Sequence, residues 1–344
     1  MTDNAARKPG GRRPETWCQR LAWVAVLLIS LANPALVLAQ SARPDPLEAI
    51  VQVSAVIPGD ARTADTLGTE REGTGVVIDD SGLILTIGYL ILEASEVSVT
   101  GSGNDPVAAD IVAYDHESGF GLVRAQRPLD AAPLVLGDSA ALRPRQPLLV
   151  VSRVGGFDAG GVYVVDRRVF AGYWEYLLED AIFTAPPRAD FGGAALIDED
   201  GGLVGIGSLI VNDAGQDGPP VPGNMFVPIN DLKPIMGDLL ANGRRSDPPR
   251  PWLGVSLEEH RGRVFVTRVT PEGPAAAAGI AENDLILGVG GAPVAGLTDF
   301  YRKLWSLGEA GVTVPLDLLQ GIEPRAMAVR SGNRYRYLKL NPTY

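Results

Sequence analysis

The sequence predicts a mainly β protein, with an antiparallel barrel pair or sandwich followed by a smaller α+β unit. Between residues 46 and 236, short apolar runs alternate with turn residues at a spacing of about ten residues, which is typical of antiparallel sandwiches and barrels. Helical periodicity is almost absent before 228–243. A Pro-rich, charged stretch, "RRSDPPRP" at 244–251, precedes a region in which strand and helix patterns alternate.

The composition fits a globular protein with a packed core and argues against two kinds of partner. The chain has 344 residues, enough for two ordinary domains beyond a targeting segment. Hydrophobic residues make up 46% and charged residues 21%, both close to globular averages. The net charge of −11 argues against binding to nucleic acid, which needs a basic face, and against binding to an anionic membrane surface.

The first 39 residues have the pattern of a secretory signal. A basic stretch at 1–20 precedes an apolar run at 21–39, which ends in "LVLAQ" with small residues before a cut at Gln40. The same run is almost long enough to span a bilayer, so an uncleaved inner-membrane anchor at 21–39 stays open as the alternative. In either case the sequence predicts an exported protein of the periplasm or cell envelope.

No cofactor or metal site is predicted. The only cysteine, Cys18, lies before the apolar run, so the exported part has no thiol, no disulfide and no cysteine-based metal site. The acidic stretch "IDEDGG" at 197–202 lacks the spacing of a calcium-binding loop, and we interpret it as a hairpin turn.

The first region contains two strong local signals and one aromatic cluster. In "GTGVVIDDSGLILT" at 73–86, two apolar runs flank a turn that ends in glycine, which predicts a β-hairpin. The stretch 228–243 predicts a helix with Asn230 as N-cap and Gly243 as the stop. The aromatic residues of "YWEYLLED" at 173–180 predict a patch on the barrel surface or at an interface.

The second region combines three predicted strands with two predicted helices, and further strands are predicted after the second helix. The strands cover 252–257, 264–269 and 284–289, and the helices cover 274–278 and 297–307. The longer helix is amphipathic, because four apolar residues recur on one face: Leu297, Phe300, Leu304 and Leu307.

Several motifs follow one another along both regions. They are the hairpin at 73–86, "LVLGDSAALRPRQPLLVVSRVGG" at 134–156, "ADFGGAALIDEDGGLVGIGSLI" at 189–210, "RPWLGVSLEE" at 250–259 and "TPEGPAAAAGIAENDLILGVGGAPV" at 270–294. In this order they resemble the HtrA/DegP family of exported trypsin-like serine proteases with a C-terminal PDZ domain. The resemblance implies a chymotrypsin-like double β-barrel at 40–236, a linker at 237–250 and a small α+β PDZ domain at 251–342.

The catalytic triad of that family is missing from the matching positions. The family's histidine lies in L-T-N-x-H-V, and "LTIGYLI" places Tyr89 there. The family's aspartate falls on Gly119 in "DHESGFGLV", and its serine falls on Phe191 in "RADFGGAALID". Cleavage by this fold needs a serine oxygen, a histidine to take its proton and a carboxylate to orient the histidine. We therefore predict no catalytic residues in this chain.

Substitute catalytic groups are scarce. The exported part has two histidines, of which His260 lies in the second region. His116 could act only with a nearby serine, such as Ser118 or Ser208, and we interpret it as an exposed loop residue. A neutral phenol at Tyr89 is a poor base. We expect the Tyr89 and Phe191 rings to project into the cleft between the barrels and plug it.

The PDZ-like region keeps its binding motif. PDZ domains bind a free C-terminus by β-augmentation, with a short loop that offers backbone amides to the carboxylate. The resemblance assigns these amides to Leu253, Gly254 and Val255. Val255 and Leu257 would edge the groove, and Phe300 and Leu304 would help line the pocket for the last side chain. The alternative is that these apolar residues only form the core.

The predicted function is therefore that of an exported HtrA-like protein without peptidase chemistry, acting as a peptide-binding adaptor, chaperone or regulator in envelope protein quality control. The predicted partners are C-terminal or unfolded peptide segments of envelope proteins, an active HtrA-type relative and further copies of the chain. Two alternatives stay open: an active serine endopeptidase, as the family implies, and a purely structural envelope component.

Overall fold

The computed structural model of the chain describes residues 46–216 and 218–340. The predicted signal or anchor at 1–39, with its apolar run at 21–39, lies outside the described residues. Within the described ranges, no helix is both long enough and apolar enough to cross a membrane.

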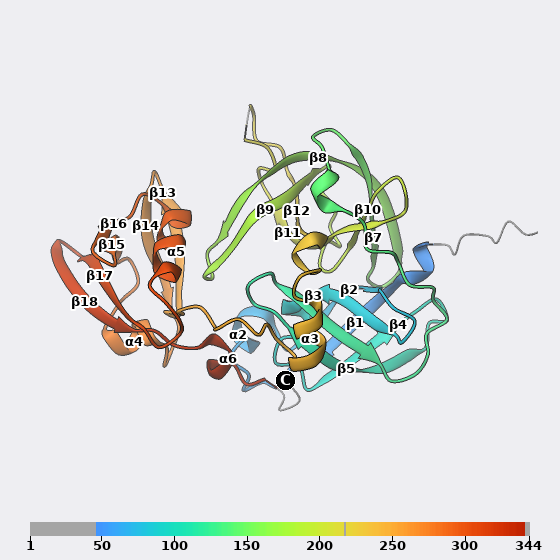
Figure 1. The fold of residues 1–344 in the computed structure, drawn as a ribbon, viewed down its shortest axis with the longest axis horizontal. Helices are drawn as coiled ribbons and strands as arrows, with labels where there is room; N and C mark the ends of the chain where they lie inside the picture. Colours follow the sequence, from blue (N-terminus) through green and yellow to red (C-terminus); the bar gives the residue numbers. More distant parts are fainter. Residues whose placement is uncertain (1–45, 217, 341–344) are drawn as a thin grey trace, which may run out of the picture. The chain divides into compact units, whose positions relative to one another are not determined.

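Six antiparallel strands close the first barrel, drawn in blue to green in Figure 1. Their order around the barrel is β1-β2-β3-β6-β5-β4, and β4 pairs with β1 to close it. The strands are β1 (Ile50–Val56), β2 (Glu70–Val77), β3 (Leu83–Ile87), β4 (Glu96–Thr100), β5 (Pro106–Tyr114) and β6 (Phe120–Ala125). Three short helical segments accompany them: η1 (Pro46–Ala49), α2 (Ala64–Leu67) and η2 (Gly88–Leu90).

The second barrel is also closed by six antiparallel strands, in the order β10-β11-β12-β9-β8-β7. They are β7 (Pro147–Arg153), β8 (Phe157–Gly172), β9 (Tyr176–Ala185), β10 (Ala195–Ile197), β11 (Leu203–Val211) and β12 (Gly223–Pro228), with η3 (Ser139–Ala141) before β7. Gly172 pairs with Tyr176, so the long β8–β9 hairpin turns through residues 173–175. The two barrels confirm the predicted double-barrel fold.

The predicted hairpin at 73–86 is present as β2 and β3. The side chain of Asp79 closes its turn by accepting hydrogen bonds from the backbone N–H of Ser81 at 2.8 Å and of Leu83 at 2.9 Å. These bonds satisfy turn amides that no strand can reach, which is why Asp is favoured in such turns.

The segment after the second barrel differs from its prediction. A 3-10 turn, η4 (Ile229–Asp231), comes first, and α3 (Met236–Asn242) begins only after Pro234. The residue before a proline disfavours the α conformation, so Lys233 interrupts the helix that periodicity predicts from 228. Gly243 ends α3 in the left-handed conformation, as predicted, whereas Asn230 donates to Asp138 instead of capping a helix.

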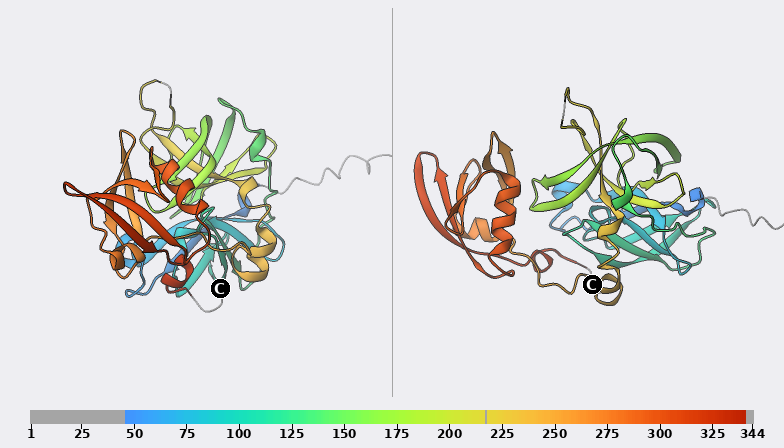
Figure 2. Two further views of the ribbon diagram at one scale, coloured as in Figure 1. Left: turned by 60° about the vertical axis from the view of Figure 1, so that its left-hand side comes forward. Right: turned by 45° about the horizontal axis from the view of Figure 1, so that its top comes forward.

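The C-terminal region is a six-stranded sheet with two helices packed beside it, drawn in orange to red in Figures 1 and 2. The strand order is β13-β14-β15-β17-β18, with β16 paired to β15. The elements are β13 (Val255–His260), β14 (Arg263–Val269), α4 (Pro274–Ala278), β15 (Leu285–Val289), β16 (Ala292–Pro293), α5 (Leu297–Ser306), β17 (Thr313–Gln320) and β18 (Glu323–Arg330). The first strand starts later than predicted, because residues 252–254 form a loop.

Apolar side chains form three main buried clusters. One fills the first barrel and extends into the second, and another lies inside the second barrel. The third lies between the PDZ-like sheet and α5, where Phe300 and Leu304 are fully buried. Burying a side chain of this size contributes about 2–3 kcal/mol of transfer free energy.

The chain returns to the first barrel after its last strand. A short helix, α6 (Arg334–Tyr337), leads into a tail in which Leu338 packs with Leu92 and Tyr114 of the first barrel. The backbone N–H of Lys339 donates to Glu93 at 2.6 Å, and its ammonium group donates to Asp60. No local pattern in the sequence predicts these contacts between the tail and the first barrel.

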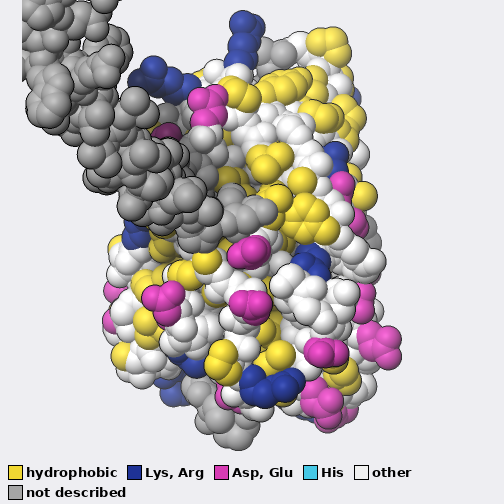
Figure 3. All heavy atoms as spheres, turned by 90° about the vertical axis from the view of Figure 1, so that its right-hand side faces the viewer, with side chains coloured by type: hydrophobic (Ala, Val, Ile, Leu, Met, Phe, Trp, Pro, Cys, Tyr) yellow, Lys and Arg dark blue, Asp and Glu magenta, His cyan; other side chains and the backbone are white. Residues whose placement is uncertain are grey.

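The surface carries charges of both signs. On the face shown in Figure 3, the Lys and Arg side chains stand singly among acidic and apolar ones, and no basic patch gathers outside the grey atoms. This distribution agrees with the acidic net charge of −11.

Candidate functional site

The turn that carries Phe191 lies where the two barrels meet. The backbone N–H of Thr74 in β2 donates to the Gly192 carbonyl at 2.8 Å, and the Gly193 N–H donates to Gly207 in β11 at 2.9 Å. A Cβ atom at Gly193 would lie 1.9 Å from the Thr74 carbonyl oxygen. The second of the paired glycines is therefore required by this close backbone approach, whatever residue precedes it.

Tyr89 faces the same junction from η2. Its hydroxyl donates to the Ser208 carbonyl oxygen in β11, with 3.0 Å between the two oxygens. Burial raises the pKa of Tyr89 above the ordinary value of 10.0. The phenol is therefore neutral at physiological pH and bridges the two barrels as a hydrogen-bond donor.

A side chain at position 119 would be strained and crowded. Its backbone is in the left-handed region with φ of 87°, a conformation that side-chain-bearing residues rarely adopt. A Cβ atom there would lie 3.1 Å from the hydroxyl oxygen of Tyr176, which itself donates to the Ser118 carbonyl at 2.5 Å. The Tyr176 phenol thus crowds the position beside Gly119.

The prediction that His116 is an exposed loop residue is wrong. Its side chain is only 9% exposed, and its ring stacks on Tyr335 of the C-terminal tail with 4.4 Å between centroids. Burial, helped by the charge of Arg334, lowers the pKa of His116 to about 3, so the imidazole is neutral at physiological pH. The tail that covers the ring comes from the far end of the chain, where no local pattern announces the contact.

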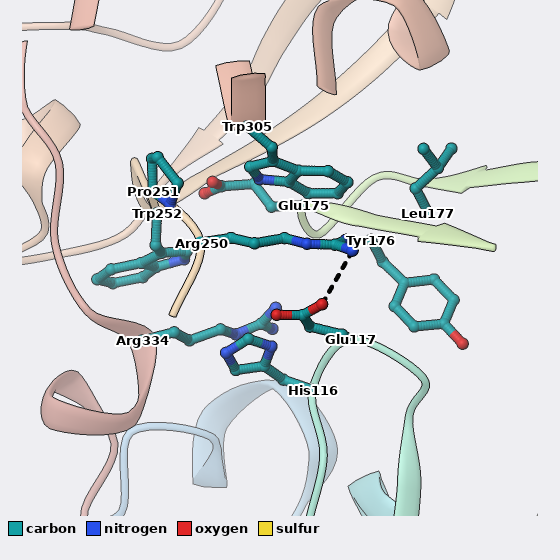
Figure 4. Close-up of a pocket in the computed structure, with 10 residues that line it drawn as sticks. All are labelled: His116, Glu117, Glu175, Tyr176, Leu177, Arg250, Pro251, Trp252, Trp305 and Arg334. Atoms are coloured by element: carbon teal, nitrogen blue, oxygen red, sulfur yellow. Dashed lines mark ion pairs between the residues drawn. The ribbon is translucent and has the colours of Figure 1, made fainter. Parts of the chain in front are cut away.

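The His116 ring borders a small cavity. Among the residues that the structure describes, its Nε2 atom has no hydrogen-bond partner. The cavity beside it has a volume of about 20 Å³, enough for one water molecule. Figure 4 shows the ring with Glu117, whose carboxylate pairs with Arg250 at 2.9 Å. Ser118 donates to Asp115, so it is not bonded to the imidazole.

Asp115 anchors this loop to the segment that leaves α3. Its carboxylate is fully buried and receives two hydrogen bonds from the Arg245 guanidinium, at 2.9 and 2.8 Å. A bidentate pair of this kind is among the stronger polar contacts in proteins. The loop that holds His116 and Gly119 is therefore fixed by a salt bridge that crosses 130 residues of sequence.

Tyr89 and Phe191 line an open cavity. Its volume is about 630 Å³, and its wall includes Leu92, Trp174, Ser208 and Leu209. The ring pairs found within the described part of the chain do not include Tyr89 with Phe191. The expected aromatic plug is thus not formed: one ring is tied to Ser208, and Phe191 is partly exposed.

No cluster of three or more His, Cys, Asp or Glu side chains that could hold a metal ion occurs between residues 46 and 340, residue 217 aside.

The three amides predicted to bind a carboxylate do lie together, and they contact one side chain. Glu175, in the β8–β9 turn, accepts from the backbone N–H of Leu253 at 2.9 Å, of Gly254 at 2.7 Å and of Val255 at 3.1 Å. Burial raises the pKa of Glu175, while these amides and the charge of Arg334 act in the opposite direction.

The side chains predicted to edge the groove are buried. Leu257, Phe300 and Leu304 are fully enclosed in the PDZ-like core, and Val255 is 5% exposed. Leu177 of β9 belongs to the same apolar cluster. Their burial is what the alternative, a purely structural core, expects, and the barrel hairpin that carries Leu177 packs against the same cluster.

Two residues at this contact, Glu175 and Tyr301, carry no signal of it in the sequence. Glu175 lies between Trp174 and Tyr176 in the aromatic stretch, and Tyr301 lies on the apolar face of α5. Tyr301 is fully buried, and its hydroxyl donates to the Gly172 carbonyl at 2.7 Å. The aromatic patch at 173–180 was predicted, and its role at a contact with the PDZ-like region is what the structure adds.

The fold and the site together define the class of protein. Residues 73–206 match the trypsin-like peptidase domain family, and residues 251–330 match the PDZ domain family. The chain thus carries a trypsin-like peptidase domain followed by a PDZ domain.

The curated relatives that the chain resembles are proteases of the HtrA/DegP type. A probable periplasmic serine endoprotease, DegP-like, of Pseudomonas fulva is 26% identical over 297 residues, covering 80% of this chain and 60% of that protein. Protease Do-like 1, chloroplastic, of Arabidopsis thaliana is 25% identical over 295 residues, covering 78% and 66%. Periplasmic serine endoprotease DegP of Escherichia coli is 26% identical over 264 residues, covering 72% and 54%. The chain spans little more than half to two thirds of these relatives.

Solved structures agree with the fold. The HtrA-type protease AlgW with decapeptide superimposes with a TM-score of 0.51 at 18% identity, covering 86% of this chain and 97% of that chain. A serine endoprotease from Yersinia pestis gives a TM-score of 0.51 at 21% identity, covering 83% and 94%. These likenesses concern the fold.

The Tyr89 hydroxyl is expected to make a small contribution to stability. Tyr89→Phe should lower the free energy of unfolding by about 1 kcal/mol, because the Ser208 carbonyl loses its bridging donor in a partly buried place. Urea denaturation measures the change, with Tyr163→Phe on the exposed side of β8 as the control. A change as small as that of the control would show that the bridge contributes nothing.

Proposed function

We propose that the chain is an exported HtrA-like protein without peptidase activity that binds peptide segments of envelope proteins. It would act as an adaptor, as a chaperone or as a regulator of an active relative. The observation that carries the first part is the set of residues at the three triad positions, Tyr89, Gly119 and Phe191. None of them supplies a nucleophile, a base near neutral pKa or an orienting carboxylate.

The surroundings of these positions support the proposal. The Tyr89 phenol has a raised pKa and is held by Ser208, and the Tyr176 hydroxyl crowds Gly119. His116 is buried and neutral, and its serine neighbour is bonded elsewhere. His260 is exposed on β13 of the PDZ-like region. Within the described part of the chain, no hydrogen bond joins a serine to His116 or to His260.

Peptide binding is supported by the loop at 253–255. Three convergent backbone amides form an anion site that suits a terminal carboxylate, and β13 offers an edge for an added strand. The names of the relatives favour a periplasmic location, and the solved relative AlgW is described with a decapeptide. Export to the periplasm and peptide binding are therefore proposed for this chain too.

Three measurements on residues 40–344 test the proposal. A fluorophosphonate probe should not label the protein, and labelled casein should stay intact. An array of decapeptides with free C-termini should contain members that bind saturably. Labelling, or casein cleavage abolished by one Ser→Ala or Thr→Ala change, would instead support an active endopeptidase. If no decapeptide binds saturably, the result would support a purely structural role in the envelope.

A further inference from the structure

The carboxylate-binding loop is occupied by a carboxylate of the same chain. Both oxygens of Glu175 are used: Oε2 accepts from Leu253, and Oε1 accepts from Gly254 and Val255. The Glu175 side chain is 6% exposed. Figure 4 shows its carboxylate pointing toward the segment of Pro251 and Trp252. This arrangement is the one that a peptide C-terminus would need.

The backbone around Glu175 continues the likeness to a bound peptide. The Leu257 N–H in β13 donates to the Tyr173 carbonyl at 2.8 Å, a contact of the kind that joins an added strand to a sheet edge. On the other side, the Glu175 N–H donates to the Tyr301 hydroxyl of α5 at 3.1 Å. The turn at 173–175 therefore contacts both β13 and α5.

An apolar side chain of the hairpin also enters the PDZ-like core. Leu177, two residues after Glu175, is 8% exposed and clusters with the apolar residues of the PDZ-like region. Nearby, the exposed carboxylate of Glu179 pairs with Arg302 of α5. Carboxylate, strand contact and apolar side chain thus all come from one hairpin.

The conformation of Glu175 points to a specific role for its side chain. Its φ is 56°, in the left-handed region where glycine or asparagine is usual at a hairpin turn. A glutamate in this region is strained, because its Cβ approaches the backbone carbonyl oxygen. Glycine would remove this strain, so the contacts of the carboxylate are what glutamate adds at this position.

We propose that the β8–β9 turn is an internal ligand that closes the peptide site, with Glu175 in place of a C-terminal carboxylate. This inference rests on the proposed function in that an outside peptide is the competing ligand. Such a peptide can bind the amides of 253–255 only when the turn at 173–175 has moved away from them. Its apparent affinity is then its intrinsic affinity multiplied by the open fraction of molecules.

Glu175→Gln tests the closure in the full chain of residues 40–344. Glutamine keeps the length of the side chain but lacks the charge and offers only one acceptor oxygen to the three amides. Fluorescence polarisation with the decapeptide array should show binding at least about tenfold tighter than in the wild type. The same peptides with amidated C-termini should not show this gain. Glu175→Gly, which suits the left-handed turn, guards against a folding defect and should give the same gain.

Asp180→Asn is the matched control, because Asp180 lies in the same hairpin but pairs with Arg167 of β8 and not with the PDZ-like region. It removes one negative charge and leaves the three amide contacts intact, so peptide affinity should stay within about twofold of the wild type. An equal gain in this control would attribute the effect to net charge and overturn the proposal.

Hydrogen exchange separates this proposal from the proposed function. The amides of 253–255 should be protected in the wild type and should exchange faster in Glu175→Gln and Glu175→Gly. Unchanged exchange, or equal peptide affinity in wild type and variants, would overturn the internal ligand. Faster exchange without peptide binding in any variant would support the internal ligand and overturn peptide binding as the function.

Discussion

Restoring the three residues of a trypsin-like triad is expected not to restore cleavage. The variant Tyr89→His/Gly119→Asp/Phe191→Ser should remain at least about 10⁴-fold slower on casein than an intact triad would be, which is the cost of losing the aspartate alone. The main obstacle is position 119, where φ is 87° and the Tyr176 hydroxyl lies 3.1 Å from the place of the new Cβ. An aspartate that cannot reach the histidine leaves the base in the wrong tautomer.

Fluorogenic casein and a fluorophosphonate probe measure this result, and circular dichroism shows that the variant is folded. Adding Tyr176→Phe removes the crowding oxygen, so any recovered labelling should appear first in this fourfold variant. Efficient cleavage by the threefold variant would contradict the prediction and show that the site needs only its three side chains.

Removing the buried carboxylate of Asp115 is expected to destabilise the protein strongly. Asp115→Ala should lower the free energy of unfolding by about 3–5 kcal/mol, because it leaves the Arg245 guanidinium without its partner. The nearest remaining carboxylate, Glu117, is 4.0 Å from Arg245. Asp110→Ala, on the exposed side of β5, is the control and should change the value by no more than about 0.5 kcal/mol.

The Asp115 effect should depend on pH in one direction. Burial by itself would raise the pKa of Asp115, but the hydrogen bonds and charge of Arg245 outweigh it, so the pKa lies below the ordinary 3.8. A carboxyl with a lowered folded-state pKa stabilises the fold above its unfolded-state pKa and loses this effect as the pH falls through the folded-state value. The difference between wild type and variant should therefore be constant above about pH 5 and shrink below about pH 4. A difference that grows on acidification would contradict this linkage.

Local patterns predicted the elements of this fold well. The helix at 274–278 was predicted from its run of alanines, and the start of α5 at Leu297 was predicted from the spacing of its apolar residues. The hairpin at 73–86 was placed by its turn residues. The predicted start of α3 was wrong, because the effect of Pro234 outweighed the periodicity of the apolar residues around it.

The candidate site could be predicted only where the chain keeps a motif. The amides at 253–255 and the residues at the triad positions were read from motifs that span a few residues. Glu175 and the His116–Tyr335 stack could not be read in this way, because each joins segments from different domains. Contacts of this kind depend on how the whole chain folds back, and no local spacing encodes them.

The PDZ-like domain is attached to the first barrel at both of its ends. Before the domain, Arg245 pairs with Asp115 of the first barrel. After the domain, the tail at 338–339 contacts Glu93 and Leu92 of the same barrel. The domain is therefore held at two points, which restricts its rotation more than a single linker would. If a ligand displaces the β8–β9 hairpin from the loop at 253–255, movement of the hairpin alone is therefore favoured over rotation of the whole PDZ-like domain.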